Sequence, residues 1–138
     1  MAIAKRVEDL DVWQRAKDLT NLIYKHSTDG TFSRDFGLRD QMRRAAVSIM
    51  SNIAEGFESQ TQAMFIKYLA YAKGSAGELR AQLYIARDQG YITEEDFNTM
   101  FSTAEICSRQ LSRFIQYLES QPNARRVREE GATYDVEH

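Results

Sequence analysis

Two glutamates, Glu55 and Glu78, are the residues of this sequence best suited to acid–base chemistry, and antiparallel pairing of their two segments would bring Arg43 and Arg44 within reach of Glu78. A pair of carboxylates can act as a general acid and a general base. The simpler interpretation is structural, because partly buried carboxylates beside arginines balance their charge and fix how two helices align. We favour this second interpretation and expect a structural polar cluster of Arg44, Asn52, Glu55 and Glu78.

Other catalytic and metal-binding motifs are missing from the sequence. One cysteine, Cys107, and two histidines, His26 and His138, are too few for a disulfide framework or for a site with several Cys or His ligands. There is no phosphate-binding loop of the Walker type and no Glu-x-x-His motif of the di-iron bundles. We therefore expect no enzyme activity, no metal and no cofactor, and we interpret Cys107 as a buried core thiol.

The second group of candidate functional residues consists of regularly spaced cations. Lys73, Arg80 and Arg87 recur every seven residues, which is nearly two helical turns, and Arg39 and Arg43 lie one turn apart. Such rows can contact phosphates in a salt-sensitive way that depends little on base sequence. The alternative is a solvated flank whose charges pair within or between subunits. Both interpretations stay open, and these five residues are our candidates for nucleic-acid binding.

Four amphipathic helices must position these side chains. Apolar residues recur every three or four positions in the segments 11–27, 38–58, 61–89 and 93–119. Turn-forming residues follow the first segment, with a loop to Gly37, and Ser59 and Gly90 separate the others. The residues expected to face the core are Val12, Ala16, Leu19 and Ile23; Leu38, Met42, Ala45, Ala46, Ile49, Ile53 and Phe57; Phe65, Tyr68, Leu69, Ala72, Leu79, Leu83 and Ala86; and Phe97, Met100, Phe101, Ala104, Leu111, Ile115 and Leu118.

Short connections favour antiparallel neighbours, so these segments predict an all-α fold, an antiparallel up-and-down four-helix bundle over residues 1–120. Residues 121–138 have little apolar content, and we expect a flexible charged tail. Three arginines there, Arg125, Arg126 and Arg128, could contact RNA, but acidic residues follow them directly.

Composition limits the function classes. With 18 Lys and Arg against 20 Asp and Glu, the net charge of −2 gives no overall attraction to nucleic acid, so any binding must use a local patch. The first residues lack the apolar segment of a signal peptide, and no apolar run approaches the roughly 20 residues that span a bilayer. We expect a cytoplasmic protein with no membrane partner.

The segment 61–89 carries a second apolar face, well over a quarter-turn from its core face. Its members are Ile66, Ala70, Gly77, Ala81 and Tyr84. One bundle core cannot cover both faces, so we predict a homo-oligomer with these five residues in the subunit interface. The alternative is a few small residues scattered on a solvated face.

Two glycines, Gly74 and Gly77, lie in the middle of the same segment. Each interior glycine costs a helix about 1 kcal/mol relative to alanine, so a tight backbone contact should offset that cost. Folding the chain about Ser59 sets the small residues of 38–58 against those of 61–89. We therefore predict a close approach of these two helices at Gly74.

Three stretches of the sequence carry a family resemblance: LDVWQRAKDL (10–19), FGLRDQMRRAAVSIMSNIAEGFE (36–58) and FIKYLAYAKGSAGELRAQLYIARDQGYI (65–92). They resemble the four-helix-bundle family of 23S rRNA intervening-sequence proteins over most of residues 10–119. Met50 stands where that family often has proline. The residues in its motif positions, which look mainly architectural, are Arg43, Arg44, Ser48, Asn52, Glu55, Gly56, Gly74, Ser75, Glu78 and Leu79.

The resemblance implies a left-twisted antiparallel bundle that assembles as a homopentamer, with no established catalysis. It also implies RNA or a nucleoprotein as partner, as in the distantly similar accessory protein of diversity-generating retroelements. Our hypothesis is a non-enzymatic homo-oligomeric scaffold that binds RNA or a nucleoprotein through basic rows. The alternatives are a protein–protein adaptor or structural oligomer without nucleic-acid affinity and, less favoured, a small-molecule-binding bundle or enzyme that uses the glutamate and arginine cluster.

Overall fold

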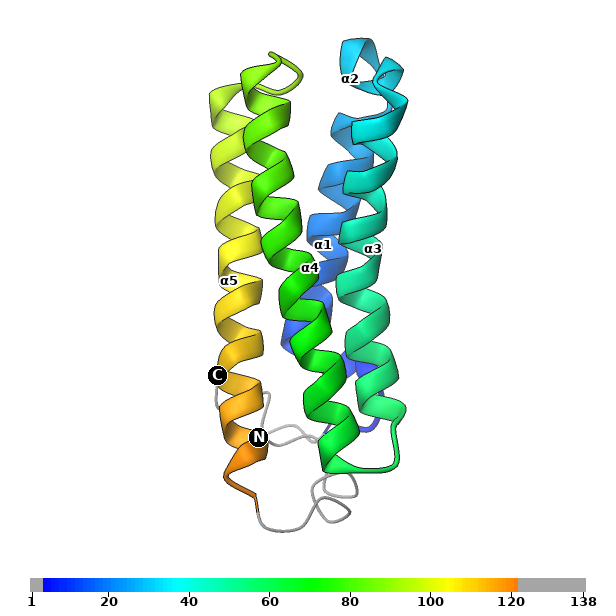
Figure 1. Cartoon of the computed structure of the whole chain (residues 1–138), viewed down its shortest axis with the longest axis vertical. Coiled ribbons are helices and arrows are strands. Elements are labelled where there is room, and N and C mark those ends of the chain that lie inside the picture. Colours follow the sequence, from blue (N-terminus) through cyan, green and yellow to red (C-terminus); the bar gives the residue numbers. More distant parts are fainter. Residues whose placement is uncertain (1–3, 122–138) are drawn as a thin grey trace.

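Four long helices make up most of the protein in the computed structural model, which describes residues 4–121 (Figure 1). The helices are α1 (Asp11–His26), α3 (Phe36–Glu58), α4 (Gln62–Asp88) and α5 (Glu94–Glu119). Two short elements, η1 (Val7–Asp9) and α2 (Gly30–Arg34), precede α1 and α3. Residues 4–121 contain no strand, and each long helix begins and ends within two residues of its predicted limits. The all-α prediction is confirmed.

The long helices pack as an up-and-down four-helix bundle. Helix α1 packs against α3 and α5, and α4 packs against the same two helices from the opposite corner. Short connections at 59–61 and 89–93 make α4 run antiparallel to α3, and α5 antiparallel to α4, as Figure 1 shows. Each helix therefore has two neighbours, one side facing the core and one side facing outward.

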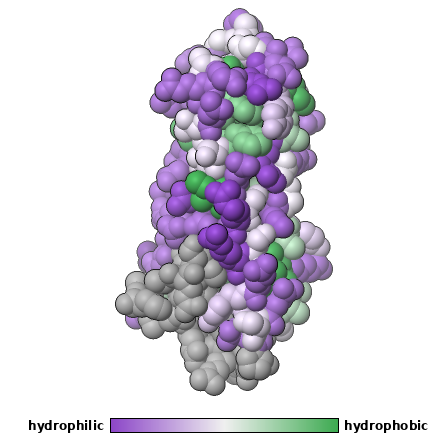
Figure 2. Space-filling model, turned by 90° about the vertical axis from the view of Figure 1, so that its left-hand side faces the viewer, coloured by the Kyte–Doolittle hydropathy of each residue, from purple (hydrophilic) through white to green (hydrophobic). Residues whose placement is uncertain are grey.

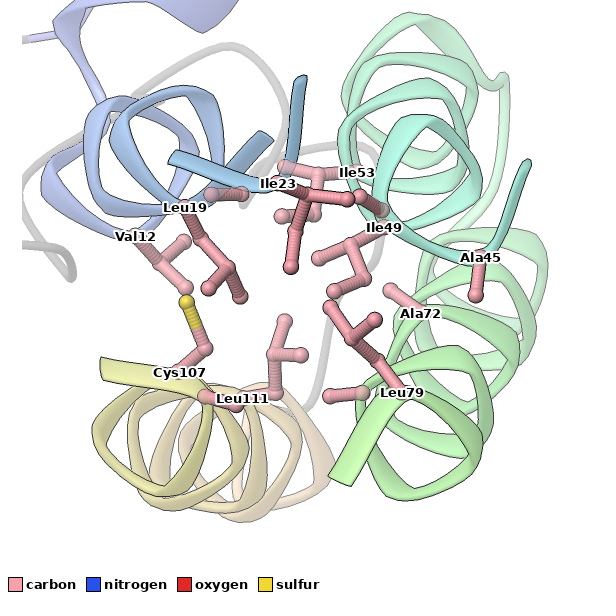
Figure 3. Packing of buried hydrophobic residues seen from close by; sticks show 14 of the residues in the cluster. Val12, Leu19, Ile23, Ala45, Ile49, Ile53, Ala72, Leu79, Cys107 and Leu111 are labelled. Carbon is pink, nitrogen blue, oxygen red and sulfur yellow. The ribbon is translucent and has the colours of Figure 1, made fainter. Parts of the chain in front are cut away.

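One apolar core fills the space between the helices. Leu19, Ile49, Leu79 and Leu111 point into it from four different helices and are fully buried (Figure 3). Among the residues predicted to face inward, the half-buried ones are Leu38, Phe57, Tyr68, Phe101 and Ile115. The core also includes Leu10, Phe32, Ala76 and Phe114, which the helical patterns did not single out.

Short polar side chains start two of the long helices. Thr61 Oγ1 accepts a hydrogen bond from Met64 N at 3.1 Å, and Thr93 Oγ1 accepts one from Asp96 N at 3.0 Å. Both contacts satisfy backbone donors that have no partner within their helix. Gly90, at φ 76°, ends α4 in the left-handed region that glycine favours. Gly90 is the separator that the sequence indicated between these two helices.

The loop predicted up to Gly37 instead contains α2, and α3 begins at Phe36. Phe32 in α2 is 2% exposed and stacks on Tyr91, with ring centroids 5.3 Å apart. The Tyr91 hydroxyl donates to Asp35 at 2.9 Å. Phe32 and Tyr91 thus close this end of the bundle. The sequence did not predict a buried Phe32, because the residues around it favour turns.

The predicted close approach at Gly74 is wrong within the single chain. Among residues 4–121, a Cβ atom at Gly74 would have no neighbour within 4 Å, and one at Gly77 would meet only Arg80 Nη2 at 3.6 Å. The crowded glycine is Gly56, where a Cβ would lie 2.8 Å from Phe65 Cδ1. The glycine that a tight contact between α3 and α4 requires is therefore Gly56, near the connection that joins the two helices.

None of the helices in residues 4–121 is both long and apolar enough to cross a bilayer. The charged tail predicted for 121–138, with Arg125, Arg126 and Arg128, lies outside the described residues apart from Gln121.

Candidate nucleic-acid interface

A groove of about 420 Å³ lies on the surface where α4 and α5 run side by side. We call it the basic groove. Its lining residues are Lys73, Arg80, Ser108, Arg109, Ser112, Arg113 and Gln116. Figure 2 looks onto the side of the bundle where α5 lies, and strongly hydrophilic side chains gather across the middle of that face. Since the lining includes cations from two helices and no carboxylate, the groove favours an anionic ligand.

Helical spacing explains how the groove forms. Lys73 and Arg80 are two turns apart on α4, and Arg109 and Arg113 are one turn apart on α5. Residues at these spacings lie on one side of a helix. Because α4 and α5 pack along their length, the two basic sides meet at one surface depression.

Most of the charge in the basic groove is uncompensated. Lys73 and Arg109 are exposed, Arg80 is half-buried, and none of the three forms an ion pair with any residue in 4–121. Exposed cations without carboxylate partners keep their full attraction for a phosphate ligand.

The groove unites two of the five predicted nucleic-acid-binding residues, Lys73 and Arg80, with two that the sequence did not single out, Arg109 and Arg113. The spacing of α5 held a signal for the missed residues. Residues 109, 112, 113 and 116 are all polar or basic and share one side of that helix.

Two further predicted cations, Arg39 and Arg43, are engaged in holding the fold. Arg39 pairs with Asp40 at 2.9 Å, and this hydrogen bond lowers the pKa of the Asp40 carboxyl below its ordinary value. Arg43 donates to Ser27 Oγ at 2.9 Å and lies 4.5 Å above the centre of the Tyr24 ring. Both contacts tie these arginines to their own chain.

Arg87, the third member of the predicted row on α4, is also occupied. It forms ion pairs with Asp88 at 3.3 Å and with Glu94 at 3.8 Å. Its guanidinium lies over the rings of Phe97 at 4.5 Å and Tyr84 at 5.1 Å. The predicted basic row on α4 is therefore divided. Arg87 contacts the start of α5, whereas Lys73 and Arg80 line the groove.

The ion pairing expected in the polar cluster is absent from the described part of the chain. Arg44, Glu55 and Glu78 are exposed, and none of them forms an ion pair within residues 4–121. No interaction in this part of the chain brings the two glutamates together as an acid–base pair.

Serines make the polar contact between α3 and α4 instead. Ser48 Oγ and Ser75 Oγ are 2.9 Å apart, and Asn52 Nδ2 donates to Ser48 O at 2.8 Å and to Ser48 Oγ at 3.0 Å. The serine contact sets residue 48 opposite residue 75, more than one turn from the alignment obtained by folding the chain about Ser59. In this alignment residue 44 comes opposite residue 79, so a shift along the helices does not account for the missing ion pair between Arg44 and Glu78 within residues 4–121.

The predicted interface residues divide into two sets. Ile66 is half-buried against the core, and Tyr84, although 45% exposed, packs on Phe97 and Phe101 with centroids 5.3 Å and 5.2 Å away. The three small residues of the set, Ala70, Gly77 and Ala81, lie farther out, with the alanines exposed. The two large side chains thus have partners in their own chain.

The described residues offer no cluster of three or more His, Cys, Asp or Glu side chains that could hold a metal. Cys107 is fully buried, as expected, and burial raises the pKa of its thiol to about 12. A thiol in that state is a poor nucleophile at neutral pH.

Known proteins resemble this chain in sequence and in fold. A crystal structure at 1.70 Å, of a protein with unknown function from the S23 ribosomal protein family of Bacteroides thetaiotaomicron VPI-5482, aligns with a TM-score of 0.70 and 25% identity. The alignment covers 76% of this chain and 98% of that one. Curated proteins gave no match. The family model described as 23S rRNA-intervening sequence protein matches residues 8–113, so the chain belongs to that family.

Proposed function

We propose that the protein is a non-enzymatic, cytoplasmic, homo-oligomeric scaffold that binds RNA through phosphate contacts in the basic groove. The observation that carries the proposal is the groove itself, in which four cations from two helices line one surface without a carboxylate. Cations that neutralise backbone phosphates release counterions and thereby drive association. Such contacts depend on the RNA backbone and carry little base specificity.

The overall charge of −2 supports a local site. A protein with a small negative net charge does not attract RNA over its whole surface. Only a local excess of positive charge, such as Lys73, Arg80, Arg109 and Arg113 provide, can then select where the RNA binds. The acidic remainder of the surface restricts binding to the groove.

The outer side of α4 supports self-assembly. Gly74 lies on this side in mid-helix and has open space around it among residues 4–121, so no contact in the described part of the subunit offsets its helical cost of about 1 kcal/mol. Ala70 and Ala81 are exposed on the same helix, as are the large side chains Tyr71 (51%) and Ile85 (48%). We propose that a second copy packs here, in the pentamer that the family resemblance implies.

Assembly and RNA binding reinforce each other in this proposal. A ring repeats one modest groove in every subunit, and linked sites gain affinity without any new contact. A single groove of four cations is then enough for firm binding by the ring.

Titration with a labelled single-stranded RNA tests the RNA component. Three phosphate contacts per groove, from Lys73, Arg80 and Arg109, predict that affinity falls by roughly 20-fold between about 50 and 200 mM salt. Fluorescence anisotropy at both concentrations measures this change. If the protein binds no RNA even at low salt, the RNA component fails.

A protein–protein adaptor without nucleic-acid affinity is the second candidate. It is favoured by the exposed apolar side chains Tyr71 and Ile85 and by Arg44 and Glu78, which are exposed and form no ion pair within residues 4–121. An oligomeric protein that binds no RNA in the anisotropy titration would support the adaptor function.

Replacing Ala81 by arginine should dissociate the subunits, because a long charged side chain would stand on the exposed side of α4 that we assign to the interface. Light scattering measures the mass, and a monomer of 15.9 kDa with unchanged helical content is expected. Asn21→Arg, on the exposed surface of α1, is the matched control and should leave the mass unchanged. Full assembly of Ala81→Arg would assign the interface to another surface.

A further inference from the structure

Two buried polar atoms without partners belong to residues of the basic groove. Within the described residues, three buried side-chain polar atoms make no hydrogen bond: Arg80 Nε, Ser108 Oγ and Gln82 Oε1. Arg80 and Ser108 line the groove, one from each helix, whereas Gln82 does not. Ser108 is only 7% exposed. Because an unpaired buried donor is costly, two of them in one groove indicate a ligand that accepts hydrogen bonds.

We infer that Arg80 and Ser108 form a binding site for one phosphate group of the bound RNA, which we call the phosphate site. The inference deepens the proposed function and rests on it for the source of the phosphate. Arg80 Nε–H and the Ser108 hydroxyl donate to phosphate oxygens, and Lys73 and Arg109 add positive charge at the rim. Charge-assisted hydrogen bonds of this kind are the strong ones in proteins.

The chemistry of the lining selects an oxyanion. Lysine and arginine only donate hydrogen bonds, and no lining residue is acidic, so a cation would meet only repulsion. The hydrogen-bond donors of the phosphate site come from two helices, with Arg80 on α4 and Ser108 on α5, and do not all lie in the plane of one guanidinium. A tetrahedral phosphate offers oxygens in both directions, whereas a planar carboxylate uses its two oxygens on the fork of a single arginine.

Gly77 borders the phosphate site. A Cβ atom at this position would lie 3.6 Å from Arg80 Nη2, an ordinary van der Waals contact, so the guanidinium does not require a glycine there.

If Ser108 belongs to a phosphate site, its replacement by alanine should affect stability and RNA affinity in opposite directions. Ser108→Ala removes a buried hydroxyl that has no partner in the protein, so the melting temperature should stay equal or rise. The same change should lower the affinity for RNA about tenfold, because one hydrogen bond to a charged group is lost. A serine with a purely structural role would not change the affinity.

The test uses the full chain and three probes: inorganic phosphate, and one single-stranded RNA bearing either a 5′-hydroxyl or a 5′-phosphate. Nitrogen-15 NMR follows the Arg80 Nε–H signal during phosphate titration, with acetate at equal ionic strength as the carboxylate control. Anisotropy measures the affinity of both RNAs for Ser108→Ala and Arg80→Lys. The matched controls are Ser102→Ala, exposed on the same helix, and Arg34→Lys, exposed outside the groove.

We expect phosphate, but not acetate, to shift the Arg80 signal. Ser108→Ala and Arg80→Lys should each weaken RNA binding about tenfold, whereas Arg34→Lys should change it less than about twofold because Arg34 does not line the groove. Equal losses for both RNAs assign the site to an internal phosphodiester, and a loss only for the 5′-phosphorylated RNA assigns it to the terminal phosphate. Either pattern supports the phosphate site.

Unchanged RNA affinity in Ser108→Ala and Arg80→Lys would overturn the phosphate site while leaving RNA binding by the groove intact. If the unmodified protein binds no RNA, the proposed function fails, and the phosphate titration alone decides the site: an Arg80 shift that Ser108→Ala abolishes supports it, and no shift overturns it.

Discussion

Reversing two charges of the basic groove, Lys73→Glu together with Arg109→Glu, should lower the affinity for RNA by roughly 100-fold at about 0.1 M salt. Two phosphate contacts are lost, and two carboxylates enter a groove that has none. Both residues are exposed and form no ion pair within residues 4–121, so the fold loses nothing with them. The free energy of unfolding should change by less than about 0.5 kcal/mol.

A double reversal elsewhere separates the groove from overall charge. Lys17→Glu with Arg34→Glu changes two exposed cations outside the groove and gives the same net charge. Its RNA affinity should remain within about threefold of the original, because charges farther away than about one Debye length of 10 Å are screened. Anisotropy and thermal melting are measured for both variants. Equal losses in the two would contradict a localised groove and indicate a diffuse electrostatic attraction.

The fold was predictable because its information is local. Leu19, Ile49, Leu79 and Leu111 each belong to a regular apolar pattern within one helix, and all four are fully buried. Such a pattern requires no knowledge of the neighbouring helices. Phe32 shows the limit, since it is buried in a five-residue helix too short to have a pattern of its own.

The candidate site was only partly predictable because it depends on two helices at once. Periodicity places Lys73, Arg80 and Arg87 in one row, but it contains no information on which neighbour each will meet. Glu94 and Phe97 engage Arg87, while the residues opposite Arg80 are serines and arginines of α5. The rotation of α5 against α4 decides this difference, and a single sequence does not specify that rotation.

Helix α4 combines three roles on its circumference. One side enters the core, a second lines the basic groove, and the outer side carries the small residues that we assign to self-assembly. Gly77 and Ala81 lie one turn apart, with Arg80 between them in sequence. A change at the subunit interface is therefore expected to alter RNA binding through lost multivalency, so mass and affinity should be measured on the same variants.

Replacing Gly56 by leucine should lower the free energy of unfolding by about 1–3 kcal/mol, and by more if the aromatic rings cannot move. Already the first added atom would lie 2.8 Å from Phe65 Cδ1 and 3.1 Å from Tyr68 Cβ. The Phe65 ring has little freedom to retreat, because it packs edge-on against Phe57 and against the buried Phe114, with centroids 6.3 Å and 5.2 Å away. Chemical denaturation measures the loss.

Gly74→Leu is the matched control for Gly56→Leu, since both changes place the same side chain at a helical glycine. Open space surrounds Gly74, so its leucine variant gains helix propensity and should equal or exceed the original in stability by up to about 1 kcal/mol. Light scattering accompanies the measurement, because Gly74 belongs to the outer side of α4, where leucine is expected to hinder assembly. Equal destabilisation of both monomers would show that a side chain at Gly74 is as crowded as one at Gly56, and would contradict the open space found around Gly74 within residues 4–121.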